Sequence, residues 1–243
     1  MPLEGVMPTV GERARALNQR FASHAAIDVL RGALSEPMVG RAALVSSFGT
    51  EAVVLLHMIA HLDRTTPVIF ADTEMLFEET ITYQEMLSER FGLTDVRRVR
   101  PERSDLLRED ADGILHVFDT DACCDLRKTR PLKSALEPFD AWITGRKRFQ
   151  GGARVGLEFF EAETARRIKI NPLAYWRRGD VEDYMVNNRL PRHPLVTKGF
   201  SSVGCAPCTT PVAPGEDPRA GRWRGQSKDE CGIHFVNGKL VRG

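Results

Sequence analysis

The five cysteines of this 243-residue chain lie in three short patches. Two patches hold close pairs, Cys123-Cys124 and Cys205-Ala-Pro-Cys208, and the third holds Cys231 alone. Two sulfurs separated by two residues can bind one centre from a tight turn, so the pairs suggest a four-thiolate zinc or iron–sulfur site. Adjacent side chains diverge by about 100° on a helix, which would strain Cys123 and Cys124 around one zinc ion but suits a cluster with separate irons. The pairs therefore favour a 4Fe–4S cluster over zinc, with buried cysteines that bind no metal as the remaining alternative.

Cys231 has no partner in this pattern and stands on a short C-terminal tail. The thiolate is the reactive form of cysteine, and nearby cations lower its pKa. Arg219, Arg222 and Arg224 precede it in the sequence. We expect Cys231 to act as a nucleophile that meets two reactants in turn; the alternative is a surplus exposed cysteine.

Further basic residues stand close to predicted structural elements. Lys128 comes soon after the first cysteine pair, and the loop 145–154 carries Arg148 and Arg154. Together with the arginines before Cys231 they would suit a small polyanionic substrate, because guanidinium groups bind oxyanions through two parallel hydrogen bonds. The whole chain has 34 basic and 33 acidic residues. This balance argues against the extended basic surface that a nucleic acid would need.

A strand, a small-residue turn and an apolar helix follow one another in residues 41–62. Residues 41–46 form an apolar run, residues 46–50 read Ser-Ser-Phe-Gly-Thr, and residues 51–62 are apolar on nearly every face. In such arrangements the free backbone N–H groups and the positive end of the helix face an anion. Many α/β loops share this composition, so the turn alone does not specify a phosphate site.

The rest of the chain alternates between strand and helix patterns. We predict strands at 41–46, 67–72, 96–99, 142–144 and 168–170, and helices at 77–91, 124–137 and 179–189, the last with Asp180 as its N-cap. This alternation predicts an α/β fold with a mostly parallel sheet and helices on both faces. Because ligands of such sheets bind at the carboxyl ends of the strands, residues 46–50, 72–75 and 145–154 should surround one crevice.

Three segments are expected along the chain: an N-terminal helical segment at 1–40, an α/β domain at 41–200 that holds the ligand, and a loop-rich C-terminal tail at 201–243. The first residues lack the apolar stretch of a secretory signal, and no run reaches the ~18–20 apolar residues of a membrane-spanning helix. We therefore expect a cytoplasmic protein, in which a reducing environment favours metal-binding or catalytic cysteines over disulfides.

A series of motifs runs from about residue 42 to residue 234. They are Ser46–Thr50, Phe70–Thr73, Leu76–Thr80, Cys123–Lys128, Thr144-Gly145 with Gln150 and Arg154, Asn171–Leu173, Trp176, Asp180-Val181, Leu190–Leu195, Ser202–Thr209 and Glu230–His234. In this order they resemble the motifs of the assimilatory adenylyl-sulfate (APS) reductases, within the wider phosphoadenylyl-sulfate (PAPS) reductase family.

The resemblance implies a PP-loop fold related to adenine nucleotide α-hydrolases, with residues 41–200 binding the nucleotide and one 4Fe–4S cluster per chain. It implies reduction of adenosine 5′-phosphosulfate to sulfite and AMP by a separate thioredoxin, in sulfate assimilation and cysteine biosynthesis. A homo-oligomer is compatible with it. Matched by position, the expected cluster ligands are Cys123, Cys124, Cys205 and Cys208, and the expected nucleophile, which would form an S-sulfocysteine, is Cys231.

The expected substrate-binding residues are Ser46, Ser47, Phe48, Gly49, Asp72, Lys128, Arg148, Arg154, Arg219, Arg222 and His234. The sequence departs from the family pattern at Glu74, where glycine is frequent, and at Lys147, where arginine is frequent. Glu51 also adds a negative charge beside the expected phosphate loop. These departures bear on the contacts to the nucleotide.

Three other functions compete with APS reduction. The nearest is reduction of PAPS, or of both nucleotides; that branch usually lacks the two cysteine pairs. A tRNA-thiolating PP-loop enzyme would need an ATP-type Ser-Gly-Gly-x-Asp-Ser loop and a basic RNA-binding face, and neither residues 46–51 nor the balanced charge fits. A non-enzymatic metal or redox sensor would leave Cys231 incidental.

Overall fold

The computed structural model describes residues 8–226, 228, 235–236 and 239–240, which fold around a six-stranded sheet. Neighbouring strands follow the order β3-β2-β1-β4-β6-β5. The pairs run parallel, except that β5 is antiparallel to β6. The strands are β1 (Ala42–Ser46), β2 (Val68–Ala71), β3 (Val96–Val99), β4 (Ala141–Ile143), β5 (Phe160–Ala162) and β6 (Ile168–Ile170). The predicted mostly parallel sheet is confirmed, and the short antiparallel edge strand β5 is an addition that the sequence pattern did not indicate.

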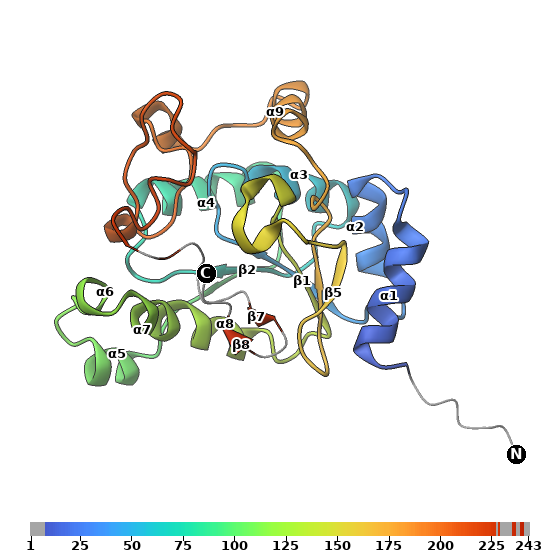
Figure 1. Cartoon of the computed structure of the whole chain (residues 1–243), viewed down its shortest axis with the longest axis horizontal. Helices are drawn as coiled ribbons and strands as arrows, with labels where there is room; N and C mark the ends of the chain where they lie inside the picture. The colour runs from blue at the N-terminus through green and yellow to red at the C-terminus, as the bar shows by residue number, and fades with distance from the viewer. Residues whose placement is uncertain (1–7, 227, 229–234, 237–238, 241–243) are drawn as a thin grey trace, which may run out of the picture.

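Alternate side chains along the strands face different apolar cores, as the two-residue period of a strand requires. Leu44 and Phe70 point into the larger core, whereas Ala43 and Trp142 point into a smaller one. Figure 1 shows the helices that cover the two faces. The larger core lies under α3 (Ala52–Leu62), α4 (Glu78–Phe91) and α9 (Arg178–Asn187), and the smaller one under α8 (Arg130–Ala135).

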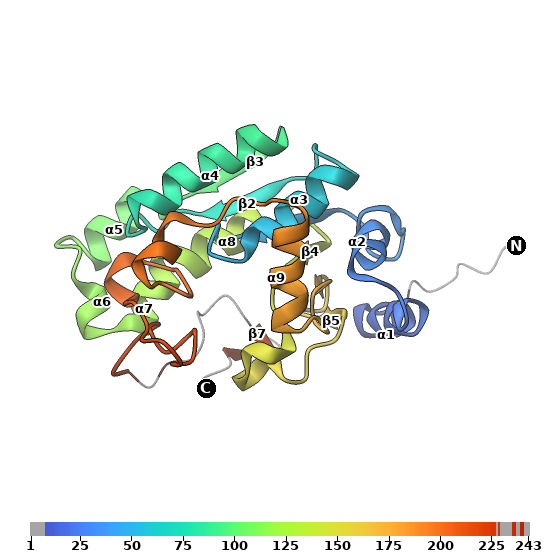
Figure 2. The ribbon, with the colours of Figure 1, turned by 90° about the horizontal axis from the view of Figure 1, so that it is seen from above.

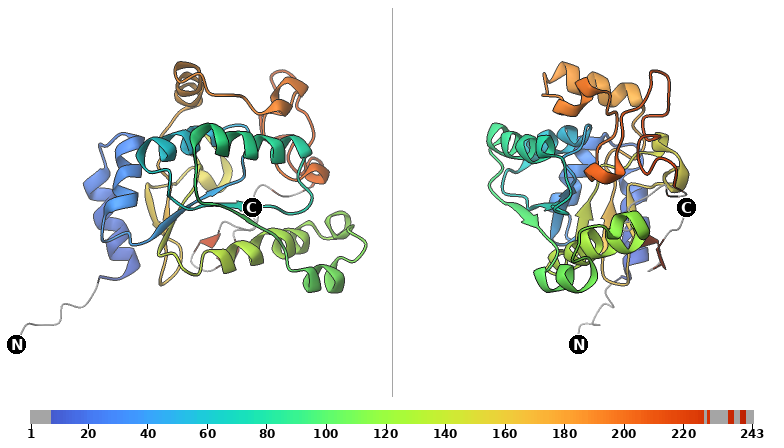
Figure 3. Two further views of the ribbon diagram at one scale, coloured as in Figure 1. Left: turned by 180° about the vertical axis from the view of Figure 1, so that it is seen from behind. Right: turned by 90° about the vertical axis from the view of Figure 1, so that its left-hand side faces the viewer.

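Two N-terminal helices, α1 (Val10–Phe21) and α2 (Ala26–Ser35), pack at the β5 end of the sheet (Figure 3). They contribute to the larger core. Asn18 of α1 pairs with the backbone of Phe160 in β5, donating to its oxygen at 2.8 Å and accepting from its nitrogen at 2.9 Å. The side-chain amide thus forms hydrogen bonds with backbone N–H and C=O groups that this edge strand would otherwise leave unpaired.

The chain between β3 and β4 is more broken than the predicted helix at 124–137. It forms α5 (Arg103–Glu109), α6 (Leu115–Phe118), α7 (Thr120–Cys124), a π-helical turn (Asp125–Thr129) and then α8. A π turn is a rare, wider coil that often occurs at functional sites. It changes the directions of the residues that directly follow the cysteine pair.

Helix α9 begins earlier than expected. Asp180 is not its N-cap: Arg177 occupies that position, and the Asp180 carboxylate reaches back to accept from Arg177 N at 2.6 Å. This is the role of an acidic residue in the first turn of a capping arrangement. The prediction placed the N-cap three residues too late, and the helix start one residue too late, because the acidic residue serves the cap from inside the helix.

Beyond residue 194 the described chain is mostly irregular, with 3₁₀ turns at Pro194–Lys198 and Ala206–Cys208 and the short strands β7 (Phe235–Val236) and β8 (Lys239–Leu240). It returns to the carboxyl edge of the sheet, where Thr50 Oγ1 donates to Ser201 O at 2.9 Å and Ala206 N donates to Met75 O at 2.7 Å. Figure 2 shows this segment passing between α4 and α7. Among the described residues, no helix is both long and apolar enough to cross a membrane.

Candidate active site

A cavity of about 240 Å³ opens at the carboxyl edge of the sheet. Ser46, Ser47 and Gly49 line it, at the end of the central strand β1. The tail contributes residues 201–204 and 217–219 to the same cavity. The predicted crevice is therefore present, with residues of 46–50 and 145–154 in its wall, but none of residues 72–75 lines it; Ala71 and Leu76 do so instead, and the tail closes one side.

The loop between β1 and α3 is held by its own side chains. Ser46 Oγ accepts a hydrogen bond from Phe48 N at 3.1 Å. Phe48 adopts a left-handed φ of 49°, and its fully buried ring meets the Phe70 ring at 5.0 Å. This anchor in the core places the loop at the start of α3, where the helix dipole and free N–H groups favour an anion. Phe48 therefore supports the loop with its side chain in the core and not in the cavity.

Cations reach the cavity from separate parts of the chain. Lys128 comes from the π turn, Arg154 from the loop after β4, and Arg219 and Arg222 from the tail. Arg178, at the start of α9, also lines it. Because these positive charges surround one small space next to the β1–α3 loop, the cavity suits an elongated ligand with several negative charges.

The π turn separates two consecutive cations. Lys128 lines the cavity, whereas Arg127 is buried and turns the other way. Arg127 Nη2 lies 2.6 Å from Asp110 Oδ2, and its Nη1 donates to Thr73 O at 3.1 Å. Burial works to raise the pKa of the Asp110 carboxyl, but hydrogen bonds from Leu115 N and from Arg127 outweigh it and lower that pKa. Arg127 thus ties the π turn to the loop after β2.

Arg222 is fitted closely to its surroundings. Its guanidinium stacks 4.4 Å from the centre of the Trp223 ring. A Cβ atom on Gly204 would lie only 2.3 Å from Arg222 Nη2. Glycine at position 204 therefore leaves the space that this guanidinium occupies at the cavity wall.

Besides Phe48, two further predicted substrate ligands do not line the cavity. Asp72 is buried and forms ion pairs of 2.7 Å with Arg98 and Arg100. Burial alone would raise the pKa of Asp72, but hydrogen bonds from Arg100, the Glu74 backbone and Arg98 lower it. Arg148 turns outward and stacks 4.0 Å from the centre of the Tyr175 ring. Cys231 and His234 lie outside the described residues.

The structure adds cavity residues that were not among the expected substrate-binding residues. Arg146, Lys147 and Gln150 line the cavity, although their neighbour Arg148 does not. The basic run 146–148 was the signal available in the sequence, but it does not say which side chains turn inward. Thr80 also lines the cavity, from the first turn of α4.

The predicted cluster ligands lie on two elements next to this cavity. Cys123 and Cys124 are buried at the end of α7, and Cys205 precedes the 3₁₀ turn that ends at Cys208. Burial, followed by the nearby Cys205 and Cys208, raises the pKa of Cys123 to about 11, against the opposing charge of Arg127. The thiols of the two pairs are therefore close enough to interact. Within the described chain, no three His, Cys, Asp or Glu side chains are grouped as around one metal ion.

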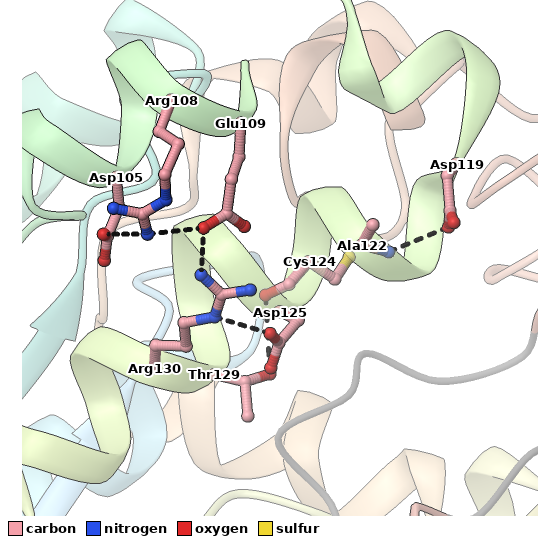
Figure 4. Close-up of polar contacts among 9 residues, drawn as sticks. All are labelled: Asp105, Arg108, Glu109, Asp119, Ala122, Cys124, Asp125, Thr129 and Arg130. Carbon is pink, nitrogen blue, oxygen red and sulfur yellow. Dashed lines mark hydrogen bonds and ion pairs between the residues drawn. The ribbon is translucent and has the colours of Figure 1, made fainter.

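Polar contacts hold the cysteine helix from both ends, as Figure 4 shows. Asp119 caps α7 by accepting from Ala122 N at 2.8 Å, and Thr129 Oγ1 donates to Cys124 O at 3.4 Å across the wide turn. Outside the turn, Arg130 bridges Asp125 and Glu109 at 2.7 and 2.8 Å.

The tail is attached at the other end of α7. Thr120 Oγ1 donates to Gln226 Oε1 at 2.8 Å, and Lys228 pairs with Asp121 and donates to Thr120 O. Cys231 follows Lys228 by three positions in the sequence.

Comparison with known proteins gives a consistent result. The family model described as "Phosphoadenosine phosphosulfate reductase domain" matches residues 41–211. The chain is 49% identical over 226 residues to an adenosine 5′-phosphosulfate reductase of Mesorhizobium japonicum, covering 93% of this chain and 89% of that one. It is 40% identical over 195 residues to a phosphoadenosine 5′-phosphosulfate reductase of Gloeobacter violaceus, covering 79% and 81%. A phosphate complex of phosphoadenylyl-sulfate reductase from Candida auris has a similar fold, with a TM-score of 0.68, 24% identity, and coverage of 81% and 96%.

Proposed function

The chain belongs to the phosphoadenosine phosphosulfate reductase family, and from this premise we propose that it reduces adenosine 5′-phosphosulfate to sulfite and AMP with a separate thioredoxin. The observation that carries the proposal is the cavity in which the loop after β1 meets cations from the π turn, the 145–154 loop and the tail. A nucleoside phosphosulfate offers that site a base, a phosphate and a sulfate in a row.

The first half-reaction would be a displacement at sulfur. The Cys231 thiolate attacks the sulfate sulfur, a bond forms between the two sulfur atoms, and the bond from that sulfur to the bridging oxygen breaks. AMP leaves with the electron pair, and the enzyme holds an S-sulfocysteine. An anion attacks an anion in this step, so Lys128, Arg219 and Arg222 would assist it by neutralising the charge that develops on the oxygens.

The second half-reaction would use the two electrons of a dithiol. One thioredoxin thiolate attacks the Cys231 sulfur and releases sulfite, leaving a mixed disulfide. The second thioredoxin thiolate attacks its own partner sulfur, which returns Cys231 as a thiolate and leaves oxidised thioredoxin. A reducing cytoplasm would keep Cys231 as a thiol between turnovers.

The two cysteine pairs support a thiolate-bound cluster, because they lie on two separate elements and the buried Cys123 thiol interacts with both Cys205 and Cys208. Cys123, Cys124, Cys205 and Cys208 would hold one 4Fe–4S group, which would add local charge beside Lys128 and join the tail to the sheet domain. Iron analysis of anaerobically purified protein should give about four irons per chain with a broad absorbance near ~400 nm; a colourless, zinc-loaded protein would contradict this assignment.

Covalent catalysis by Cys231 can be tested directly. Mass spectrometry of anaerobic enzyme mixed with APS should show an adduct of ~80 Da on the peptide that contains Cys231, and reduced thioredoxin should remove it. Cys231→Ser should form no adduct and lose turnover. Active enzyme without the adduct, or activity that survives in Cys231→Ser, would contradict the mechanism.

PAPS reduction is the second candidate, and the Gloeobacter violaceus relative with that name supports keeping it. The two nucleotides differ only in a 3′-phosphate. Their kcat/KM values with the same thioredoxin decide between them. A ratio above about 100 in favour of APS, equivalent to ~2.7 kcal/mol of discrimination, is expected, whereas a ratio near one would indicate an enzyme for both.

A further inference from the structure

Three apolar side chains on one helical turn are exposed together. Ile114, Val117 and Phe118 are 46%, 66% and 79% exposed. Ile114 precedes α6, and Val117 N donates to its oxygen at 2.9 Å. Residues three and four positions apart lie on one face of a helical turn, so these side chains form one surface, which we call the apolar face of α6. None of the four residues of α6 is buried.

Exposed apolar side chains are concentrated in this part of the molecule. Seven large apolar side chains are exposed in the described chain, and four of them stand within residues 107–118. Single exposed apolar residues are common on protein surfaces, whereas a group of them marks an interaction site. Three side chains form a small patch, which suits a transient contact that buries less than ~1,200 Å² in total.

The C-terminal tail is fastened directly beside this face. Lys228 pairs with Asp121 and donates to Thr120 O at 3.3 Å, both in the first turn of α7. The Thr120 hydroxyl in turn approaches His116 O of α6 at 3.5 Å. Figure 1 shows α6 and α7 next to each other at one end of the molecule. The anchor of the tail and the apolar face of α6 are therefore neighbours.

This anchor limits where the Cys231 sulfur can be. Cys231 follows Lys228 by three positions, and three residues of fully extended chain span ~10–11 Å. In the other direction, Lys128 lies in the cavity wall, seven residues beyond Asp121 along α7 and the π turn. Helical chain of that length spans on the order of 10 Å. The cavity and the apolar face of α6 are thus both within reach of the tail from one anchor.

The reductant of the second half-reaction has to come close to the same anchor, because its thiolate must touch the Cys231 sulfur. A protein of about 100 residues has a radius of gyration of ~13 Å. This is larger than the ~10–11 Å that separates Cys231 from Lys228 at most. A reductant that reaches the sulfur therefore also covers surface around the start of α7, and the exposed apolar surface there is the face of α6.

We propose that the apolar face of α6 is the docking surface for the reduced dithiol protein, thioredoxin, that releases sulfite from Cys231. The inference rests on the proposed function and adds the surface that the reductant contacts. The partner is a protein with an apolar surface beside its reactive cysteine. The contact holds that cysteine over Cys231 while the disulfide exchange takes place. It contributes to recognition of the reductant and not to recognition of the nucleotide.

The two half-reactions can be measured separately in the full-length, anaerobically purified enzyme. APS alone loads Cys231, and reduced thioredoxin then removes the adduct. The double variant Val117→Ser/Phe118→Ser removes the apolar face. It should load at the wild-type rate, but the second-order rate constant for removal of the adduct by thioredoxin should fall about tenfold, as for central apolar residues of an interface. Removal by dithiothreitol, which needs no docking surface, should be unchanged.

Val186→Ser is the matched control. Val186 is 59% exposed, close to the exposure of Val117, but it stands on α9 in a different part of the molecule (Figures 1 and 2). This variant should react with thioredoxin as the wild type does. A thioredoxin without its second cysteine should stay joined to Cys231 as a mixed disulfide. In that complex, residues 114–119 should exchange their amide hydrogens more slowly than in the free enzyme, and residues 183–188 should not change.

Three results would overturn the docking surface. The first is an unchanged rate constant with thioredoxin in the double variant. The second is an equal loss in loading or in removal by dithiothreitol, which would assign α6 to the tail or to the fold. The third is a change from dimer to monomer with unchanged thioredoxin reactivity, which would make the face a contact between two copies of the chain. If the wild type forms no adduct with APS, the proposed function itself fails and the docking surface fails with it.

Discussion

The Lys147 ammonium lies 2.7 Å from Glu51 Oε2, in the wall of the cavity and at the start of α3. These are two of the positions at which the sequence departs from the family pattern. Glu51 alone would place a negative charge where an anionic substrate has to bind. Lys147 is only 2% exposed on its side chain and compensates that charge. Burial lowers the pKa of Lys147, while Glu51 works to raise it.

Removal of one partner of this pair should impair substrate binding. Lys147→Met would leave the Glu51 carboxylate uncompensated beside the loop after β1, and we expect the KM for APS to rise about tenfold or more, since ~1.4 kcal/mol corresponds to tenfold. The double variant Glu51→Gln/Lys147→Met should recover much of that loss. Steady-state kinetics measures both, and equal KM values for the single and double variants would show that the charge of Glu51 is not felt by the substrate.

The buried ion pair between Arg127 and Asp110 should matter for stability. Asp110→Ala leaves an unpaired guanidinium in the interior, and we expect the free energy of unfolding to fall by about 3 kcal/mol. Asp105→Ala is the matched control, because Asp105 pairs with Arg108, whose side chain is 61% exposed, and such pairs contribute under ~1 kcal/mol. Urea unfolding monitored by circular dichroism compares them. Similar losses in the two variants would contradict the distinction between the pairs.

Lys169 should make the free energy of unfolding depend on pH in the alkaline range. Its ammonium is buried 4.6 Å from the centre of the Trp142 ring and 3.6 Å from Glu163 Oε1. Burial, followed by the charge of Arg146, lowers the pKa of Lys169 to about 8, while Glu163 and Glu161 oppose the shift. Between that value and the unfolded value of 10.5, the unfolded chain binds more protons, so the free energy of unfolding rises with pH, by up to ~3 kcal/mol.

Lys169→Met should remove this rise and should be more stable than the wild type at pH 7. Urea unfolding of the two proteins between pH 7 and 10 gives the difference directly. A difference that does not change across this range would mean that Lys169 keeps its proton when buried.

His193 should make the free energy of unfolding depend on pH in the acidic range. Its pKa is about 4 in the folded protein and 6.5 in the unfolded chain, because burial disfavours the charged ring. As pH falls from 6.5 to 4, the unfolded chain takes up the proton first, and the free energy of unfolding should drop by up to ~3 kcal/mol. Subtracting the pH profile of His193→Gln from that of the wild type isolates this contribution, and parallel profiles would contradict it.

Local patterns accounted for much of the architecture. The strands predicted at 41–46 and 67–72 appear at Ala42–Ser46 and Val68–Ala71, where their apolar runs place them, because a short apolar run between polar turns has few other ways to be buried. The position of the β1–α3 loop followed equally well, since a small-residue turn between a strand and a helix is a local feature. The three-residue strand β5 was not predicted, because its own composition does not indicate a strand. It is a strand because it pairs with β6 and with the Asn18 side chain.

The sequence by itself determined the α/β alternation, the family and the set of residue types available for chemistry, because these depend on composition and spacing along the chain. Only the tertiary structure decided which cations face the cavity. Lys128 turns inward while Arg127 is buried, and Lys147 turns inward while Arg148 stacks on Tyr175. The sequence does not distinguish neighbouring basic residues of one run. The directions in which their side chains point depend on a π turn and on partners far along the chain. The contact between His193 and Thr80, separated by 113 residues, is of the same kind.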